Sequence, residues 1–343
     1  MNTFRGKNLL VIGGTGSVGT ALVKRLLTMD PAVIRVYSRD EYKQFLVQSD
    51  LTLEKNENPA LDTDKVRFFL GDVRDKERLK RAMENVDIVF DLAALKHVPA
   101  CEYNPFEAVK TNVIGTQNVI ECAIEEGVST VLYSSSDKAA GPTNTMGATK
   151  LLAERLISAA DFHKGPRNTR FFSVRFGNVL NSRGSVIPLF KKQIARGGPV
   201  TVTDPNMTRF VMSVPRAVEL ILKAVEIAHG GETFVFKMPV IKIGDLARGV
   251  IELSGANTDT KVIGLRPGEK MYEELLTEEE SNRALETEDM FVVLPFHGDC
   301  NEWSAHYSYA KRAAIGTYTS EGQAVMSYEE LKEILRVGSF HGM

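Results

Sequence analysis

The chain has 343 residues, which is long for one compact core and short for three domains. Hydrophobic residues make up 43% and charged residues 25%, and the formal net charge of -2 gives no field that would attract nucleic acid or an anionic membrane. No apolar run approaches the ~20 residues of a membrane span, and the N-terminus lacks a signal-peptide pattern. We therefore expect a cytoplasmic globular protein with one large and one smaller domain, and without nucleic-acid or membrane partners.

The cysteines are Cys101, Cys122 and Cys300. Their spacing fits neither a disulfide framework nor a zinc site. We expect reduced thiols and no metal site.

The first half of the chain alternates apolar runs with helical segments. Strands are expected at 9–12, 34–38, 66–70, 86–92, 129–134 and 171–176, and helices at 20–29, 78–84, 108–126 and 147–160. Near-continuous apolar strands that alternate with helices pack as a parallel sheet covered on both faces. The pattern therefore predicts an α/β fold with a Rossmann-type doubly wound parallel sheet and a smaller C-terminal domain. The polar segment 49–64 is expected to be a surface insertion.

The pattern loosens after residue 176. Segments 181–185 and 203–209 are loop-like, and 213–229 is helical, with Pro215 suited to an early helical turn. Segment 261–276 predicts a turn at Pro267-Gly268 followed by a helix. The last ~40 residues show weak periodicity and are expected to pack as a C-terminal extension.

Gly13, Gly16 and Gly19 form a Gly-x-x-Gly-x-x-Gly pattern between the first strand and the first helix. Glycine permits the sharp turn and leaves room for a pyrophosphate, and the helix N-terminus offers free N–H groups to the phosphates. Because the pattern follows a strand and opens a helix, it predicts a dinucleotide site rather than a ligand-free turn. Further contacts are expected from Thr15, Ser17 and Val18.

The second strand ends at Ser38-Arg39, with Lys43 one turn further on. An enzyme that uses NAD usually carries an acid at this tip, whereas a hydroxyl and two cations suit a 2′-phosphate. The tip therefore favours NADP over NAD, and an exposed charged loop is the alternative. The later strand ends are expected to contribute Asp72 beside the adenine, together with Val73, Ala93 and Ala94.

The fifth strand is followed by Ser136-Asp137-Lys138 and then by a helix with Met146 and Lys150. In extended short-chain dehydrogenases a Tyr-x-x-x-Lys pair follows this strand, and the Tyr moves the substrate hydroxyl proton. Lys150 is in register with that Lys, but a thioether at Met146 cannot transfer protons. Either the chain is inactive or another group acts. Asp137 and Lys138 stand where α/β enzymes place chemistry, which favours the second interpretation over a surface ion pair.

The chain resembles the UDP-N-acetylglucosamine 4,6-dehydratases of the polysaccharide-biosynthesis type, within the extended short-chain dehydrogenase/reductase superfamily. The matching motifs spread over residues 7 to 295 and lie at 36–41, 71–75, 93–99, 136–139, 177–179, 182–186, 207–210 and 266–270. Members with Met at the Tyr position are known, so Met146 is compatible with activity. Ser136 replaces the usual Thr and keeps a hydroxyl.

The resemblance implies that hydride moves from C4 to C6 of UDP-N-acetylglucosamine through tightly held NADP, with loss of water. Lys138 is the expected base at C5, with a pKa lowered by desolvation. Asp137, protonated, is the expected acid for the C6 hydroxyl. The C4 hydroxyl proton goes to Lys150 through a water or to Asp137 directly. The product is a UDP-4-keto-6-deoxy-N-acetylhexosamine for surface polysaccharide, glycan or nonulosonic acid synthesis.

The resemblance also implies a UDP-sugar site beyond the sixth strand, where a diphosphate requires cations and backbone donors. The expected substrate-binding residues are Lys96, Asn178, Arg183, Ser185, Val186, Arg209, Arg266 and Glu269. His97 is either near the sugar or a packed loop residue.

Residues 1–178 are expected to form the NADP-binding Rossmann domain, to which 206–260 returns. Residues 179–205 and 261–300 would form the UDP-sugar domain and 301–343 a C-terminal extension. Relatives imply a homo-oligomer, in some cases a hexamer.

Other functions remain open at this stage. A UDP-hexose 4-epimerase shares the fold and cofactor site but needs no C5 base, so Asp137-Lys138 argues against it. An inactive NADP-binding relative with a sensing or scaffolding role is opposed by Asp137, Lys138 and Lys150. A reductase that consumes external NADPH is a weaker option. Whether the configuration at C5 of the sugar is retained or inverted is open. Met146 and segment 266–276 favour retention.

Overall fold

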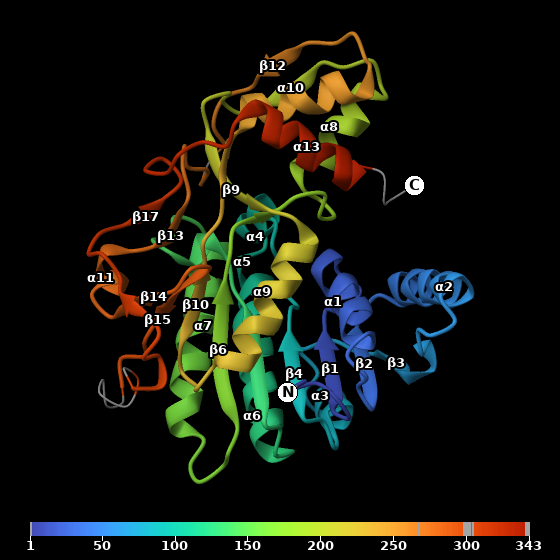
Figure 1. The fold of residues 1–343 in the computed structure, drawn as a ribbon, viewed down its shortest axis with the longest axis vertical. Helices are drawn as coiled ribbons and strands as arrows, with labels where there is room; N and C mark the ends of the chain where they lie inside the picture. The colour runs from blue at the N-terminus through green and yellow to red at the C-terminus, as the bar shows by residue number, and fades with distance from the viewer. Residues whose placement is uncertain (1, 267, 298–302, 304, 340–343) are drawn as a thin grey trace.

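The architecture is a large sheet with helices on both faces and a second lobe above it (Figure 1). The computed structural model describes residues 2–266, 268–297, 303 and 305–339. The order of the 10-stranded sheet is β16-β14-β15-β10-β6-β5-β4-β1-β2-β3. Its parallel strands are β1 (Asn8–Ile12), β2 (Val33–Ser38), β3 (Val66–Leu70), β4 (Ile88–Asp91), β5 (Thr130–Ser134), β6 (Arg170–Arg175) and β10 (Thr233–Phe236). The expected Rossmann-type α/β fold is confirmed.

The edge beyond β10 is antiparallel and uses late parts of the chain. It consists of β15 (Met290–Val293), β14 (Ala284–Glu286) and β16 (Lys311–Arg312). Trp303 and Tyr307 pack into the core beside these strands. The C-terminal residues therefore complete the large sheet, which weak sequence periodicity did not indicate.

Helices cover both faces of the sheet. The first part of the chain contains α1 (Ser17–Leu27), α2 (Glu41–Glu57), η1 (Thr63–Lys65), α3 (Lys76–Met83), α4 (Val98–Tyr103), α5 (Pro105–Val109), η2 (Lys110–Ile114) and α6 (Gly115–Glu125). Then follow η3 (Asp137–Ala139), α7 (Thr145–His163) and α9 (Val214–Ile227). The helix expected at 108–126 is present but contains a π-helical turn at η2.

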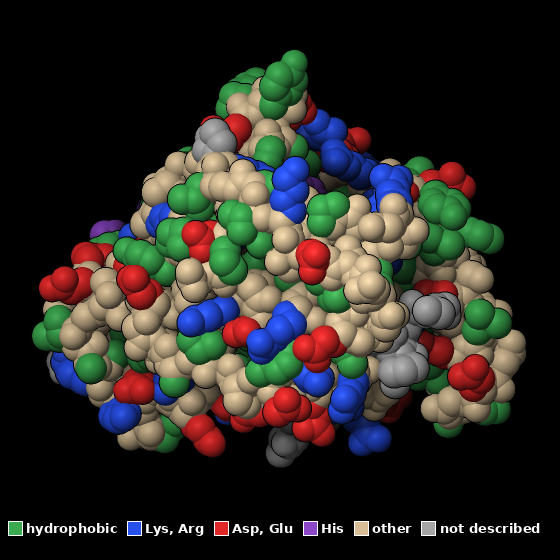
Figure 2. Space-filling view, turned by 90° about the horizontal axis from the view of Figure 1, so that it is seen from above, with side chains coloured by type: hydrophobic (Ala, Val, Ile, Leu, Met, Phe, Trp, Pro, Cys, Tyr) green, Lys and Arg blue, Asp and Glu red, His purple; other side chains and the backbone are tan. Residues whose placement is uncertain are grey.

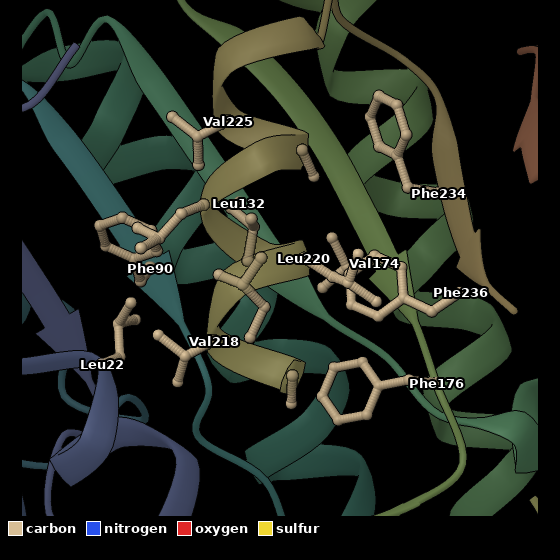
Figure 3. Close-up of a cluster of buried hydrophobic side chains, with 14 of the residues drawn as sticks. Leu22, Phe90, Leu132, Val174, Phe176, Val218, Leu220, Val225, Phe234 and Phe236 are labelled. Carbon is tan, nitrogen blue, oxygen red and sulfur yellow. The ribbon is translucent and has the colours of Figure 1, made fainter. Parts of the chain in front are cut away.

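Alternation along the strands creates two hydrophobic cores, because successive side chains point to opposite faces of a sheet. Phe90, Leu132 and Val174 face α1 and α9, where they meet Leu22 and Val218 (Figure 3). The neighbouring strand residues pack on the other side against α3, α6 and α7. Both faces are therefore buried, as the continuous apolar strands predicted.

The second lobe has its own apolar cluster. Its elements are α8 (Val186–Ile194), β8 (Val200–Val202), β9 (Thr208–Met212), β11 (Val240–Lys242), α10 (Ile243–Ser254), β12 (Thr260–Val262) and α13 (Tyr328–Ser339). Strand β9 pairs with β7 (Asn178–Val179), and β13 (Glu274–Leu276) pairs with β17 (Tyr318–Thr319). Helix α11 (Glu278–Ser281) follows β13. Basic and acidic side chains are interspersed when the molecule is seen from above (Figure 2).

The segment 49–64, expected at the surface, is largely exposed, and its first part continues α2. Two local predictions were wrong. Thr208 and Arg209 lie in β9 rather than in a loop. The helix expected before residue 276 is absent, because 274–276 pairs as a strand with the distant β17. Such tertiary pairing overrides local propensity.

Some sequence expectations fall partly outside the described residues. Cys300 and Pro267 are among them, whereas Cys101 and Cys122 are free and buried. Within the described part of the chain, no helix has the length and apolar character needed to cross a membrane.

Candidate active site

A cleft of about 770 Å³ opens at the carboxyl ends of β1, β4 and β5. It brings together most of the residues that the sequence singled out. The predicted residues that line it are Gly13, Thr15, Gly16, Ser17, Val18, Gly19, Ser38, Arg39, Lys43, Asp72, Val73, Ala93, Ala94, Lys96, Ser136, Asp137, Lys138, Met146, Lys150, Asn178, Arg183 and Ser185. His97 lines it as well. Val186, Arg209, Arg266 and Glu269 are not part of this lining.

The glycine loop requires glycine for packing reasons. Gly13 has φ of 74°, and a Cβ there would lie 3.0 Å from the Ala93 nitrogen. At Gly19 a Cβ would lie 2.5 Å from the Gly13 carbonyl oxygen. Gly16 caps α1 without a side-chain hydrogen bond, which leaves the first N–H groups of the helix facing the cleft. This bare cradle at a helix N-terminus fits the phosphates of a dinucleotide.

The tip of β2 carries both cations expected there. Arg39 Nη1 lies 3.4 Å from Asp72 Oδ2, and Lys43 Nζ lies 2.6 Å from Asp40 Oδ2. The Ser38 hydroxyl lies 2.9 Å from the Thr15 hydroxyl, so it links the strand tip to the glycine loop. The tip thus offers two partly exposed cations and a hydroxyl pair at the edge of the cleft.

Arg183 lies against the glycine loop. Its backbone N–H donates to Ser17 Oγ at 2.9 Å, and its Nη1 donates to the Thr15 carbonyl at 2.9 Å. Lys96 Nζ donates in turn to the Arg183 carbonyl at 2.7 Å. A Cβ at Gly184, where φ is 72°, would lie 2.6 Å from the His97 ring. Segment 181–185 therefore covers the glycine loop, and the His97 ring packs against Gly184.

Lys150 is buried at the floor of the cleft. Its Nζ donates to the Ser134 carbonyl at 2.7 Å and lies 4.5 Å from the centre of the Tyr133 ring. Burial lowers the pKa of Lys150 to about 8, although the charges of Asp91 and Glu154 oppose this. Burial also raises the pKa of Asp91 to about 6. Lys150 therefore loses its proton more readily than an ordinary lysine.

Asp91 was not singled out from the sequence. It is the last residue of β4 and pairs in register with Tyr133 of β5. The signal in the sequence that could have identified it is an acidic residue at the end of an otherwise apolar strand.

Met146 packs as a hydrophobic residue. It is buried with Cys101 and Ala108 near the start of α7 and also lines the cleft. A Cβ at the neighbouring Gly147 would lie 2.2 Å from the Lys138 carbonyl oxygen. Helix α7 is thus pressed directly against η3, which fixes the position of Asp137 and Lys138.

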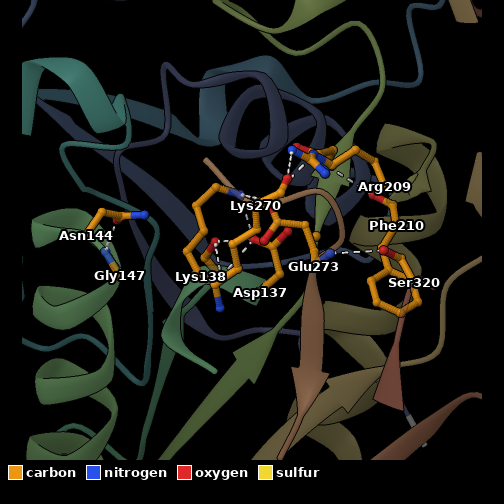
Figure 4. Close-up of polar contacts among 12 residues, drawn as sticks. Asp137, Lys138, Asn144, Gly147, Arg209, Phe210, Lys270, Glu273 and Ser320 are labelled. Carbon is orange, nitrogen blue, oxygen red and sulfur yellow. Dashed lines mark hydrogen bonds and ion pairs between the residues drawn. The ribbon is translucent and has the colours of Figure 1, made fainter. Parts of the chain in front are cut away.

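Asp137 is buried at the end of β5 with its two carboxylate oxygens in different surroundings (Figure 4). Its Oδ1 accepts hydrogen bonds from the Ser136 hydroxyl at 2.7 Å, the Lys138 N–H at 2.9 Å and Lys138 Nζ at 3.0 Å. Its Oδ2 has no hydrogen-bond partner among the described residues. A Cβ on the cleft residue Gly177 would lie 3.3 Å from Oδ2. Asp137 therefore keeps one acceptor uncommitted beside the cleft.

Lys138 contradicts one sequence expectation. Burial alone would lower its pKa, but the charges of Asp137 and Glu273 outweigh burial, and the pKa of Lys138 is raised above its ordinary value. Nζ lies 3.0 Å from Asp137 Oδ1 and 3.5 Å from Glu273 Oε1. The expected lowering was wrong because the charge of the adjacent Asp137, and after it that of Glu273, outweighs the effect of burial. Lys138 is an ammonium ion in this state.

Arg209 braces the second lobe beside Lys138. Its guanidinium donates to the carbonyls of Thr208 at 2.7 Å and Lys270 at 2.9 Å, and its Nε lies 3.5 Å from Glu273 Oε1. The sequence placed this arginine on the substrate, whereas here its hydrogen bonds go to the chain itself. Glu273 was missed because nothing in the sequence separates it from its neighbour Glu274.

The remaining predicted substrate residues divide into two groups. Asn178 and Ser185 line the cleft, whereas Val186, Arg266 and Glu269 do not. Arg266 is exposed, and its N–H donates to Glu269 Oε2 at 3.1 Å. Asn178 Nδ2 donates to the Phe210 carbonyl at 3.2 Å. Ser185 Oγ is buried without a partner among the described residues, and Val186 packs on the core of the second lobe.

The loop that holds Arg266 and Glu269 nevertheless lies next to α7. Asn144 Nδ2 donates to the Gly268 carbonyl at 3.3 Å, and Lys270 Nζ donates to the Gly141 carbonyl at 2.6 Å. The loop is therefore attached to the large lobe at the segment between η3 and α7.

The fold and the cleft together define a Rossmann-type α/β protein with its cleft at the carboxyl ends of the parallel strands. The chain belongs to the polysaccharide biosynthesis protein family, whose model matches residues 9–295. The crystal structure of Pen from Bacillus thuringiensis is 48% identical, with a TM-score of 0.90, and the match covers 98% of this chain and 99% of that chain.

Curated relatives carry different names. An uncharacterised membrane protein of Methanocaldococcus jannaschii is 51% identical, covering 99% of this chain and 98% of the relative. A UDP-N-acetylglucosamine 4,6-dehydratase (inverting) of Campylobacter jejuni is 45% identical, and the match covers 85% of this chain and 84% of the relative. A UDP-glucose 4-epimerase of Rickettsia conorii is 40% identical, and the match covers 97% of this chain and 96% of the relative. The names agree on nucleotide-sugar chemistry where they state an activity.

Proposed function

We propose that this protein is an NADP-dependent UDP-N-acetylglucosamine 4,6-dehydratase. The observation that carries the proposal is the Asp137–Lys138 pair at the end of β5, with an uncommitted carboxylate oxygen beside the cleft. A hydroxyl-bearing sugar carbon can lose water only if one group removes a proton and another protonates the departing oxygen. The pair supplies both kinds of group within 3.0 Å.

The dinucleotide would be held by the glycine loop, the strand ends and Lys150. When bound, it supplies a reversible hydride acceptor that lets the sugar be oxidised and reduced again within one turnover. Arg183 hydrogen-bonds Thr15 and Ser17 and so covers the glycine loop. This cover would slow loss of the cofactor between oxidation and reduction of the sugar. Retention of the cofactor is what an internally balanced reaction requires.

The preference for NADP depends on the tip of β2. Arg39 and Lys43 are partly exposed and can turn toward a 2′-phosphate, while Ser38 already bonds to the glycine loop. Arg39→Ala is expected to weaken NADP binding about tenfold and to change NAD binding little, as measured by isothermal titration. Equal losses for both cofactors would favour NAD as the natural ligand.

The proton steps follow from the state of each side chain. Asp137 Oδ2 can accept the C4 hydroxyl proton and later donate it to the C6 hydroxyl, which departs as water. Lys138 can remove the C5 proton as a neutral amine and return it after C6 has been reduced. Since Lys138 is an ammonium ion in this state, it must first lose a proton. Met146 takes part in none of these transfers.

The test is incubation of the purified protein with UDP-N-acetylglucosamine without added reductant. We expect a product lighter by one water, with deuterium at C5 when the reaction is run in D₂O. Proton NMR of that product also decides between retention and inversion at C5, and the C. jejuni relative carries the name of the inverting kind. An unchanged nucleotide sugar would overturn the proposal.

A UDP-sugar 4-epimerase is the second candidate, supported by the R. conorii relative of that name. Both reactions begin with oxidation at C4 and share the cofactor site. An epimerase would give a product of unchanged mass, with inverted configuration at C4 and no deuterium at C5. The same experiment therefore separates the two.

A further inference from the structure

The segment before β13 brings a carboxylate next to the catalytic pair. Glu273 precedes β13 and is almost completely buried, and its Oε1 lies 3.5 Å from Lys138 Nζ (Figure 4). The strand that carries it pairs with β17, so its place depends on residues far along the chain. Burying a carboxylate is unfavourable unless charges or hydrogen bonds compensate it.

Glu273 is held from several directions. Arg209 Nε from β9 lies 3.5 Å from Oε1, on the side away from Lys138. The Glu273 backbone N–H donates to the Ser320 hydroxyl at 3.0 Å, and that hydroxyl lies 2.9 Å from the Thr208 hydroxyl. Both β9 and Ser320, which directly follows β17, thus fix this residue. A side chain fixed in this way can hold its neighbour at a set position.

The charges alternate across the cluster. Asp137, Lys138, Glu273 and Arg209 follow one another as anion, cation, anion and cation, with consecutive atoms 3.0 to 3.5 Å apart. These are the charged groups that face Lys138 from η3, β9 and the segment before β13. Lys138 is the member that two carboxylates share.

This inference rests on the proposed function: we propose that Glu273 is a positioning residue that holds Nζ of Lys138 beside Asp137. Glu273 does not line the cleft, so it acts through Lys138. The arrangement prevents the amine from turning away from the reacting carbon. It also makes the position of the base dependent on the pairing of β13 with β17, which lie far from Lys138 in the sequence.

The proposal predicts a graded change in the pH dependence of turnover. Lys138 acts as a base in its neutral form, so kcat/KM should rise with pH through the pKa of Lys138. An anion near an ammonium ion raises its pKa, typically by about one unit or more at this distance. Removing the charge in Glu273→Gln should therefore move the midpoint to lower pH by about one unit. Glu273→Asp, with the charge further away, should move it by less.

Glu274→Gln is the matched control. Glu274 is adjacent in sequence and half-buried, and it lies by Gly141 and Lys270 rather than by Lys138. Its midpoint should equal that of the wild type. Because a merely structural role would lower rates without moving the midpoint, the midpoint separates the two explanations. We expect kcat to fall about tenfold in Glu273→Gln at pH values above both midpoints, with KM changed little, since Nζ is no longer held in place.

The experiment measures water loss from UDP-N-acetylglucosamine from about pH 7 to 12 in all four proteins, because the pKa of Lys138 lies above its ordinary 10.5. Thermal unfolding is recorded for each protein over the same range. If Glu273→Gln does not fold, Glu273→Asp decides alone. A midpoint equal to that of the wild type in the folded variants overturns the proposal. If the wild type releases no water, the proposed function fails instead. NMR titration of ¹³C-labelled Lys138, assigned with Lys138→Arg, then still reports the shift in the resting protein.

Discussion

Two buried charge clusters join the large sheet to the second half of the chain, and they differ in how completely their charges are paired. Arg175 at the end of β6 donates to both oxygens of Glu154 at 2.9 and 2.6 Å and to both oxygens of Glu280 at 2.8 and 2.7 Å. Its Nη1 also donates to the Leu275 carbonyl. In the other cluster, Asp137 keeps one oxygen without a partner among the described residues, and Glu273 lies 3.5 Å from each of its cations.

The difference separates a structural cluster from a reactive one. Bidentate pairing uses every donor of the arginine and leaves no group free for chemistry. Despite burial, which alone would raise it, the Arg175 charge and hydrogen bonds hold the pKa of Glu280 at about 2. Around Lys138 the contacts are longer and a lone acceptor remains beside the cleft. Incomplete satisfaction of buried polar groups is costly, so its location here indicates function.

The largest expected effect comes from removing the unpaired acceptor. Asp137→Asn should lower turnover about 10³-fold, because the amide can neither accept the C4 proton nor donate one to the C6 hydroxyl. Water loss is measured by mass spectrometry. Thermal unfolding should change little, since the amide oxygen can still accept from Ser136. Turnover near the wild-type rate would show that another residue moves these protons.

Arg175→Met should affect stability instead. It leaves Glu154 and Glu280 buried without their cation, which costs about 3–5 kcal/mol. Chemical denaturation measures this loss. The protein that remains folded should keep most of its activity per folded molecule. A loss below ~1 kcal/mol would mean that water or other groups replace the arginine.

The acid dependence of stability should change in Glu280→Gln. The pKa of Glu280 is about 2 when folded, below its ordinary 4.5, so the carboxylate contributes stability above pH 4.5 that is lost as pH falls toward 2. That contribution is about 3 kcal/mol. The stability difference between wild type and variant should therefore be greatest above pH 4.5 and shrink on acidification. A difference that is independent of pH would contradict the assignment.

Met146→Leu should have the smallest effect. Met146 packs with Cys101 and Ala108, and a swap that conserves volume costs less than about 1.5 kcal/mol. Turnover should stay within about threefold of the wild type, because neither side chain transfers protons. A large loss of turnover with normal stability would assign the thioether a part in the reaction.

The sequence determined the parallel part of the sheet and the glycine-loop end of the cleft, because these depend on local patterns. Continuous apolar strands alternate with helices, and Gly13, Gly16 and Gly19 stand where a strand enters a helix. Asp137, Lys138 and Lys150 follow a strand end, so the order of elements alone brings them to the same edge. Each of these features involves residues close together in the chain.

The tertiary structure decided what surrounds those residues. It placed Arg209 beside Glu273 and Arg183 on the glycine loop, and it raised the pKa of Lys138 instead of lowering it. These outcomes depend on pairing between β13 and β17 and on contacts between residues far apart in the chain, 64 positions for Arg209 and Glu273 and 135 for Lys138 and Glu273. Charge–charge interactions act through space, so a sequence shows which groups exist but not which of them meet.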